Sequence, residues 1–148
     1  MRILAYEGYM KDALAEAELA FFAGEVPVGA IVVKDDTIIS RAHNFVERDG
    51  LATAHAELRA IDIASKSLGR RLNGCTLITT LEPCPMCMGA ILNARIDVIV
   101  FGAFDPIMGC ACSAIDLSCF NKNLKVVGGV LIDDCESLLK KRFGEMRN

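Results

Sequence analysis

Three side chains that bind transition metals and one carboxylate stand in two short segments, Thr53-Ala54-His55-Ala56-Glu57 and Pro83-Cys84-Pro85-Met86-Cys87. Cysteine thiolate and imidazole are ligands that Zn2+ prefers, and a site with three protein ligands keeps a fourth position open for water. Glu57 follows close behind His55 and could move the protons of that water. The pattern therefore predicts a catalytic zinc site with His55, Cys84 and Cys87 as ligands.

The charges of this ligand set indicate which reaction it serves. Two thiolates cancel the charge of Zn2+ and a neutral imidazole adds none, so a bound water is less acidic than on a zinc held by three histidines. A nearby base is then needed, and Glu57 could take a proton from the water as the water attacks an amidine carbon of a base. The same carboxylate could return protons to the ring nitrogen and to the departing amine. The predicted reaction is hydrolytic deamination.

Other interpretations of the cysteines stay open. A closed structural zinc site would need a fourth ligand, and the chain offers several, although such a site gives no reason for a carboxylate beside a ligand. The pair Cys84 and Cys87 alone would also suit thioredoxin-like redox chemistry, which needs no distant histidine and glutamate. The available fourth ligands are Cys75, Cys110, Cys112, Cys119, Cys135 and His43.

The elements that must position these residues begin with a helix and a hairpin. Apolar residues recur at helical spacing from Tyr9, and Gly24 is a natural stop. Residues 26–33 and 37–40 are rich in β-branched side chains around a short polar turn, which predicts a β-hairpin. We expect a loop over residues 43–50.

Each of the two zinc motifs is predicted to lie at the start of a helix. Thr53 can cap a helix that continues through Ala64 and carries His55 and Glu57 in its first turns. Pro85 suits a first helical position, which makes Cys84 the cap of a second helix. The other expected elements are strands at 75–80, 97–102 and 124–131, the second helix to about residue 93, a helix at 113–120, and a closing helix after residue 133.

This alternation of helices and strands implies an α/β fold with a mostly parallel sheet covered by helices. If the strands before the two site helices are neighbours in that sheet, both helices begin at its carboxyl end, where ligand crevices form. Cys84 and Cys87 then share one helix face, and His55 can approach them across the sequence gap. No linker or repeat divides the chain, so residues 1–148 are expected to form a single zinc-dependent deaminase domain.

Composition indicates the oligomeric state and the cellular compartment of the protein. A hydrophobic content of 53% with a mean hydropathy of +0.37 is high for a monomer, and we expect the excess to line an oligomer interface. The apolar runs are far shorter than the ~18 residues of a membrane span. The first residues lack the pattern of a signal peptide, and seven cysteines suit a reducing compartment, so a cytoplasmic protein without a membrane partner is expected.

Net charge is −3, which is unusual for a surface devoted to nucleic acid, but four basic residues and one acidic residue lie within positions 140–148. This basic end is either a solvated helix end or an RNA contact.

Further segments match a known family. They are Gly24-Glu25-Val26-Pro27-Val28-Gly29-Ala30, His43-Asn44, Thr79-Thr80-Leu81-Glu82-Pro83-Cys84, and Phe101-Gly102-Ala103 with Asp105 and Gly109. On these pieces and the two zinc motifs, the chain resembles the cytidine deaminase-like superfamily almost end to end. Within that superfamily it is most similar to the bacterial tRNA-specific adenosine deaminases.

The resemblance implies a three-layer α/β/α fold around a mixed five-stranded sheet. It also implies a homodimer with one Zn2+ per subunit that converts adenosine to inosine at the wobble position of a tRNA anticodon stem-loop. His55, Cys84 and Cys87 would ligate zinc and Glu57 would shuttle protons. Asn44 would hydrogen-bond the nucleotide and Val28 would pack against the base. Asn44 could equally fix its own turn, and Val28 could be an ordinary core residue.

The chain departs from the family pattern at Leu51-Ala52, before the first zinc motif, and at Ile107, Cys110 and Cys112, in a loop expected near the RNA. Two rival functions therefore stay open. One is a zinc-dependent deaminase of a free base or nucleoside such as guanine, cytosine or cytidine, which needs no basic surface. The other is a noncatalytic, zinc-stabilised RNA-binding subunit, against which the presence of Glu57 argues.

Overall fold

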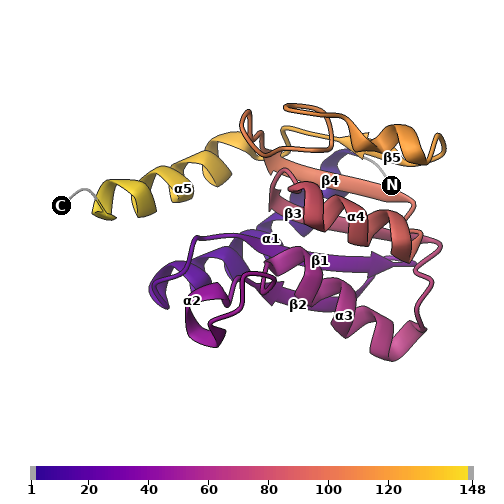
Figure 1. Cartoon of the computed structure of the whole chain (residues 1–148), viewed down its shortest axis with the longest axis horizontal. Helices are drawn as coiled ribbons and strands as arrows, with labels where there is room; N and C mark the ends of the chain where they lie inside the picture. Colours follow the sequence, from indigo (N-terminus) through magenta and orange to yellow (C-terminus); the bar gives the residue numbers. More distant parts are fainter. Residues whose placement is uncertain (1–2, 147–148) are drawn as a thin grey trace.

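The computed structural model describes residues 3–146, and these residues form one mixed sheet with helices on both faces (Figure 1). The strands lie in the order β2-β1-β3-β4-β5. Their bounds are β1 Gly29–Lys34, β2 Thr37–His43, β3 Cys75–Leu81, β4 Val98–Ala103 and β5 Lys125–Val127. The helices are α1 Ile3–Phe22, α2 Val46–Asp49, α3 Ala56–Leu68, α4 Pro85–Ala94 and α5 Ile132–Met146, with a 3-10 turn η1 at Leu117–Phe120.

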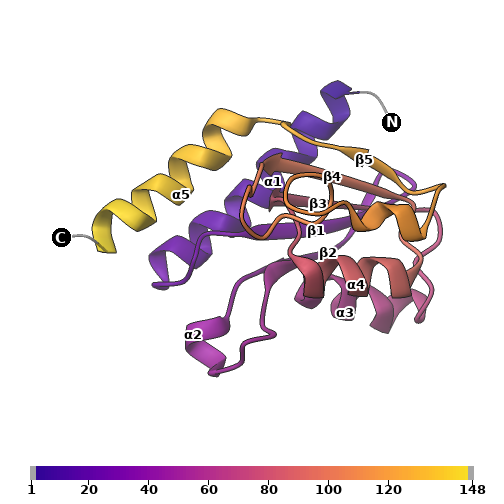
Figure 2. The ribbon, with the colours of Figure 1, turned by 45° about the horizontal axis from the view of Figure 1, so that its top comes forward.

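The helices form two outer layers, which Figure 2 shows with α3 and α4 on one side of the sheet and α1 and α5 on the other. Alternate residues of β1 point into different cores, so that Val32 packs with Ala60 and Ile91 beneath α3 and α4, while Ile31 packs with Met10 against α1. The expected three-layer α/β/α architecture is confirmed. None of the described helices is long and apolar enough to cross a membrane.

The predicted hairpin is present as β1 and β2. Its turn residues Asp35 and Asp36 both have positive φ angles, of 50° and 60°, the type I′ geometry that suits a two-residue hairpin. β1 is therefore antiparallel to β2, and it is also antiparallel to β3, whereas β3, β4 and β5 run parallel. A mostly parallel sheet was the wrong expectation from alternation alone; the sheet is mixed, as the family resemblance implied.

The strands that precede α3 and α4 are not neighbours, because β1 lies between β2 and β3. Both strands are antiparallel to β1, so β2 and β3 run in the same direction and end at the same edge of the sheet. The helices that follow these strands consequently begin at one edge and lie side by side (Figure 1). The juxtaposition was predicted correctly, although the strand pairing assumed for it was not.

Three local expectations are corrected by tertiary contacts. Thr53 is not a helix cap: α3 starts at Ala56, with His55 in the extended cap position. Residues 43–50 are not all loop, because the carboxylate of Glu25 accepts the backbone N–H groups that begin α2. The helix expected over residues 113–120 is reduced to the single turn η1.

The last strand is also shorter than the expected 124–131, since β5 stops at Val127. A Cβ at Gly128 would collide with the rings of Phe101 and Phe104, and Gly129 has a positive φ of 86°. The chain therefore leaves the sheet at these glycines and turns into α5.

Candidate metal centre and pocket

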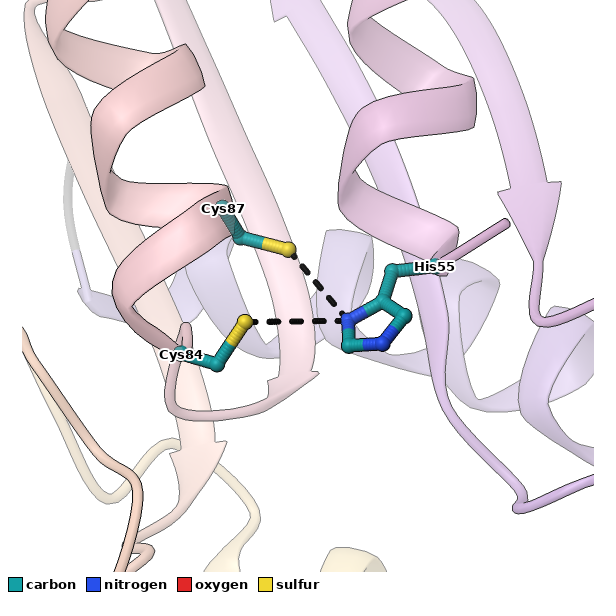
Figure 3. Close-up of side chains that lie close together, drawn as sticks. All are labelled: His55, Cys84 and Cys87. Atoms are coloured by element: carbon teal, nitrogen blue, oxygen red, sulfur yellow. Dashed lines mark hydrogen bonds between the residues drawn. The ribbon is translucent and has the colours of Figure 1, made fainter. Parts of the chain in front are cut away.

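The three predicted metal ligands meet at the adjoining starts of α3 and α4 (Figure 3). His55 directly precedes α3, Cys84 is the cap residue of α4, and Cys87 lies in the first turn of α4. Nδ1 of His55 is 3.7 Å from Sγ of Cys84 and 3.5 Å from Sγ of Cys87. Nitrogen and sulfur ligands of a tetrahedral zinc are expected about 3.6 Å apart from their bond lengths to the ion, so the donor set fits Zn2+.

The local sequence explains why both sulfurs face His55. Pro85 occupies the first turn of α4 without needing a hydrogen bond for its nitrogen, and Cys84 adopts the extended cap conformation before it. Residues three apart on one helix share a face, which directs the sulfurs of Cys84 and Cys87 to the same point. Among residues 3–146 no fourth histidine, cysteine or acidic ligand joins this group, and the structure thus gives no support to a closed four-ligand site.

The thiols of Cys84 and Cys87 differ in pKa, so the negative charge lies mainly on Cys84. Among the protein groups alone, a hydrogen bond from Cys87 lowers the pKa of Cys84 to about 4, assisted by His55, even though burial opposes it. The pKa of Cys87 is raised, first by its hydrogen bond to Cys84 and then by burial. Two adjacent thiolates repel each other, so a cation at this point would let both ionise.

Glu57 lies in the first turn of α3 and is only 4% exposed. Burial raises the pKa of its carboxyl to about 7, and the neighbouring His55 charge only partly opposes this rise. A carboxyl with such a pKa exchanges protons readily near neutral pH, which is the property that a general acid and base needs. Glu57 also lines the same pocket as His55 and Cys84.

That pocket has a volume of about 570 Å3, large enough for a nucleobase. Val28 and Asn44, the two residues expected to contact the base, both line it. Oδ1 of Asn44 accepts the backbone N–H of Ala56 at 2.8 Å, and among the described residues the amide nitrogen of Asn44 has no protein partner. Val28 is 4% exposed and belongs to the core as well as to the pocket wall. The other residues around the opening are Glu25, Val26, Val46, Glu47, Leu81, Glu82, Pro85, Met86, Asp105 and Met108.

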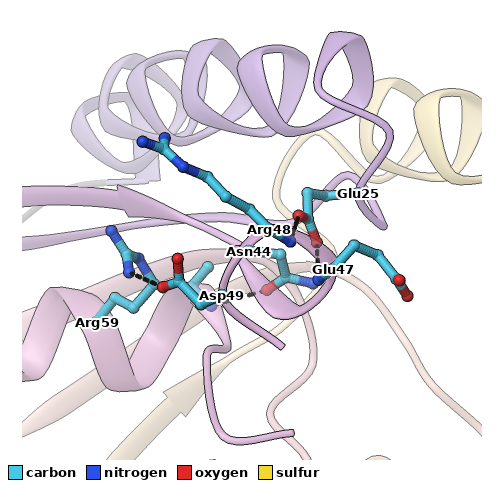
Figure 4. A network of polar contacts seen from close by, with 7 residues as sticks. Glu25, Asn44, Glu47, Arg48, Asp49 and Arg59 are labelled. Atoms are coloured by element: carbon cyan, nitrogen blue, oxygen red, sulfur yellow. Dashed lines mark hydrogen bonds and ion pairs between the residues drawn. The ribbon is translucent and has the colours of Figure 1, made fainter. Parts of the chain in front are cut away.

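One wall of the pocket is a polar network around α2 (Figure 4). The carboxylate of Glu25 accepts the N–H groups of Glu47 and Arg48, each at 2.9 Å. The guanidinium of Arg48 lies 4.8 Å from the ring centre of Phe45, and that of Arg59 lies 3.8 Å from it. These contacts hold α2 as a defined wall that carries an exposed arginine.

Sequence reasoning assigned no role to two buried carboxylates that line the pocket, Glu25 and Glu82, each 1% exposed. Both stand among apolar residues in segments that carried the family resemblance, with a proline one or two positions later. A charged residue in such a segment is the signal that could have identified them, because an ionised side chain is rarely buried without partners.

Comparisons with known proteins agree with this geometry. The family model for the cytidine and deoxycytidylate deaminase zinc-binding region matches residues 5–103. The tRNA-specific adenosine deaminase of Bacillus subtilis (strain 168) is 48% identical over 145 residues, which cover 95% of this chain and 90% of that protein.

Two solved structures bear on the substrate. One, from studies of A-to-I editing by tRNA:A34 deaminases at the wobble position of transfer RNA, has a TM-score of 0.82 and 36% identity, and the match covers 89% of this chain and 99% of that one. The guanine deaminase from Bacillus subtilis has a TM-score of 0.63 and 42% identity, with coverage of 66% of this chain and 64% of that one. The match to the tRNA deaminase structure thus covers more of the chain than the match to the guanine deaminase.

Proposed function

Because this chain belongs to the family defined by the cytidine and deoxycytidylate deaminase zinc-binding region, we propose that it is a zinc-dependent hydrolase that deaminates adenosine to inosine at the wobble position of a tRNA anticodon. The observation that carries the choice of substrate is the 48% identity to the Bacillus subtilis tRNA-specific adenosine deaminase across 95% of the chain. The metal centre and the buried carboxyl beside it supply the chemistry.

In the proposed mechanism, His55, Cys84 and Cys87 would hold one Zn2+ per subunit. Zinc, when bound, would act as a Lewis acid that makes water a stronger nucleophile. Glu57 takes a proton from the attacking water and returns protons to the ring nitrogen and to the leaving amine. Its burial keeps this exchange away from bulk water.

Asn44 and Val28 hold the base in this mechanism. The amide nitrogen of Asn44 would donate a hydrogen bond to the base, while Val28 would give the base an apolar surface; both residues line the pocket. Met86 and Met108 add further apolar surface to the same pocket. A base that is already unstacked in an anticodon loop can enter without the cost of opening a duplex.

The same proposal includes a homodimer of single-domain subunits, residues 1–148, in the cytoplasm, where its tRNA substrate would be found. Several large apolar side chains are exposed on the described surface, and exposed apolar patches mark sites of association. The most exposed are Leu4, Phe22, Ile107, Ile115 and Phe120. A second copy that covers part of this surface would account for the high hydrophobic content.

A free base is the alternative substrate, and the 42% identity to the Bacillus subtilis guanine deaminase favours guanine in particular. That match covers only 66% of this chain, against 95% for the tRNA deaminase relative. The alternative uses the same zinc ligands and Glu57, so only the substrate separates the two functions.

The test is a comparison of substrates with zinc-loaded protein. An anticodon stem-loop RNA with adenosine at the wobble position, free adenosine, cytidine, cytosine and guanine are incubated separately, and deaminated products are measured by mass spectrometry. Product from the RNA alone supports the proposal. Xanthine from guanine with no inosine in the RNA would replace it by the alternative.

A further inference from the structure

The carboxylate of Glu82, at the end of β3, is the centre of a set of hydrogen bonds that the proposed chemistry does not use. The side chain is 1% exposed. It accepts the backbone N–H groups of Asp105 at 3.1 Å, Ala111 at 3.2 Å, and Cys112 and Ser113 at 2.9 Å each, as well as the hydroxyl of Ser113. One buried side chain therefore gathers donors from both ends of a single surface segment, residues 105–113.

Gly109, in the middle of that segment, gives independent evidence for the same wrapping. A Cβ at this position would overlap the carboxyl group of Glu82 and the carbonyl oxygen of Asp105. The segment can close around the carboxylate only because residue 109 has no side chain. The N–H of Gly109 completes the turn by donating to the carbonyl oxygen of Asp105 at 2.9 Å.

Segment 105–113 forms part of the pocket wall. Asp105 and Met108 line the pocket, and Ile107 beside them is 81% exposed. Oδ1 of Asp105 accepts the N–H groups of Ile107 and Met108 at 3.1 Å each, so the position of Asp105 sets the position of both apolar side chains. A single bond from Cys110 N–H to the carbonyl oxygen of Pro83, 2.8 Å long, ties the segment to the chain beside Cys84.

No lysine, arginine or histidine within residues 3–146 forms an ion pair with Glu82. The negative charge is balanced by N–H and O–H donors alone, each of which is directional. A neutral replacement removes the charge and at least one acceptor oxygen, so some of these donors lose their partner and the segment would then move to reach water. The shape of the segment therefore depends on Glu82 as well as on its own Asp105 and Gly109.

We propose that Glu82 is a positioning residue for the RNA substrate, an inference that rests on the proposed function. Glu82 acts by holding segment 105–113 as a fixed wall at the mouth of the pocket. The groups assigned to the chemistry lie at the starts of α3 and α4 and not in this segment. Loss of the wall should therefore weaken binding of the RNA more than it slows the bound reaction.

The test compares Glu82→Gln and Gly109→Ala with Glu18→Gln, which makes the same charge change at an exposed site on α1. Gln keeps the shape of the side chain but turns one acceptor into a donor. For Glu82→Gln and Gly109→Ala we expect KM for the stem-loop RNA to rise by about tenfold or more and kcat to change by less than about threefold, while Glu18→Gln resembles the wild type. An unchanged KM, or a loss of kcat with KM unchanged, overturns the proposal.

Amide hydrogen exchange gives a second readout that does not depend on activity. In Glu82→Gln, the amides of Asp105, Ala111, Cys112 and Ser113 should exchange faster than in the wild type, while zinc content and the protection of α3 remain the same. Unchanged protection of all four amides overturns the proposal even if activity falls. If the wild type fails to deaminate RNA, the proposed function fails, and exchange still decides whether Glu82 holds the segment.

Should Glu82→Gln fail to fold, Ser113→Ala removes only the hydroxyl donor from the same carboxylate. It is expected to shift KM in the same direction by a smaller factor, about two- to fivefold. No change in KM for Ser113→Ala together with none for Gly109→Ala contradicts the proposal.

Discussion

Oδ1 of Asn44 accepts the backbone N–H of Ala56 at 2.8 Å, and Ala56 stands between His55 and Glu57. The bond ties the loop after β2 to the first residue of α3. Asn44 thus orients the start of α3, beside two site residues, and also lines the pocket. The structural role expected for Asn44 was to fix its own turn, whereas its Oδ1 holds the start of α3 twelve positions later. That role is compatible with the proposed contact of its amide nitrogen with the substrate.

Replacement of Asn44 should separate these two roles. Asn44→Asp keeps the acceptor for Ala56 N–H but removes the donor, and we expect kcat/KM to fall by about ten- to a hundredfold with little change in thermal unfolding. Asn44→Ala removes both and should also lower the free energy of unfolding by ~1–3 kcal/mol. Full activity of Asn44→Asp would show that the amide nitrogen does not contact the substrate.

Glu57→Gln should remove the proton shuttle without removing the metal. A general acid and base of this kind contributes ~10²- to 10⁴-fold, and kcat should fall by that order. Metal analysis of the purified variant should still find one zinc per subunit. Loss of zinc would mean that Glu57 is itself a ligand, contrary to its assignment.

The cysteines outside the metal centre should differ sharply in reactivity. Cys112 and Cys119 are exposed, whereas Cys135 is buried, and burial raises its pKa to about 12. Because the reagent must reach the thiol and the thiolate is the reactive form, the folded protein at pH 8 should be alkylated first at Cys119 and spared at Cys135. Cys112 is exposed but should react more slowly than Cys119, since partial burial and the charge of Glu82 raise its pKa. Peptide mass spectrometry after brief alkylation measures the extent of labelling at each cysteine. Rapid labelling of Cys135 would contradict the packing of this α5 residue against Gly102 of β4.

Two glycine substitutions test the packing of α1 on the sheet. A Cβ at Gly29 would collide with the backbone of Ala13 and Ala17 in α1, so Gly29→Ala should destabilise the protein by ~1–3 kcal/mol. Gly8 lies on an exposed part of α1 with open space around it, and Gly8→Ala should stabilise by ~0.5–1 kcal/mol. Denaturant unfolding of both variants gives the comparison, and equal effects would argue against the close approach of Gly29 to α1.

The sequence was informative where local rules decide the structure. Pro85 and the spacing of Cys84 and Cys87 predicted the start of α4 and the shared direction of its sulfurs, and the polar turn before Thr37 predicted the hairpin. These features depend on residues within a few positions of one another.

The sequence was misleading where distant contacts decide. Thr53 has the right chemistry for a helix cap, but Asn44 from another segment accepts the first N–H of α3 instead. A helix was predicted over residues 113–120, but Glu82 from another segment fixes the backbone at Ala111, Cys112 and Ser113, and only η1 forms after it. The position of β1 between β2 and β3 likewise follows from sheet pairing, which no local pattern in either strand encodes.

The measurement that tests the central claim most directly is the position of inosine in a reacted RNA. Zinc-loaded protein is incubated with a stem-loop that has adenosine at the wobble position and with a matched stem-loop whose adenosine lies one position away, and both are analysed by nuclease digestion and mass spectrometry. We predict inosine at the wobble position only, and none with Glu57→Gln. Inosine in neither RNA, from protein that carries zinc and deaminates guanine, would contradict the account.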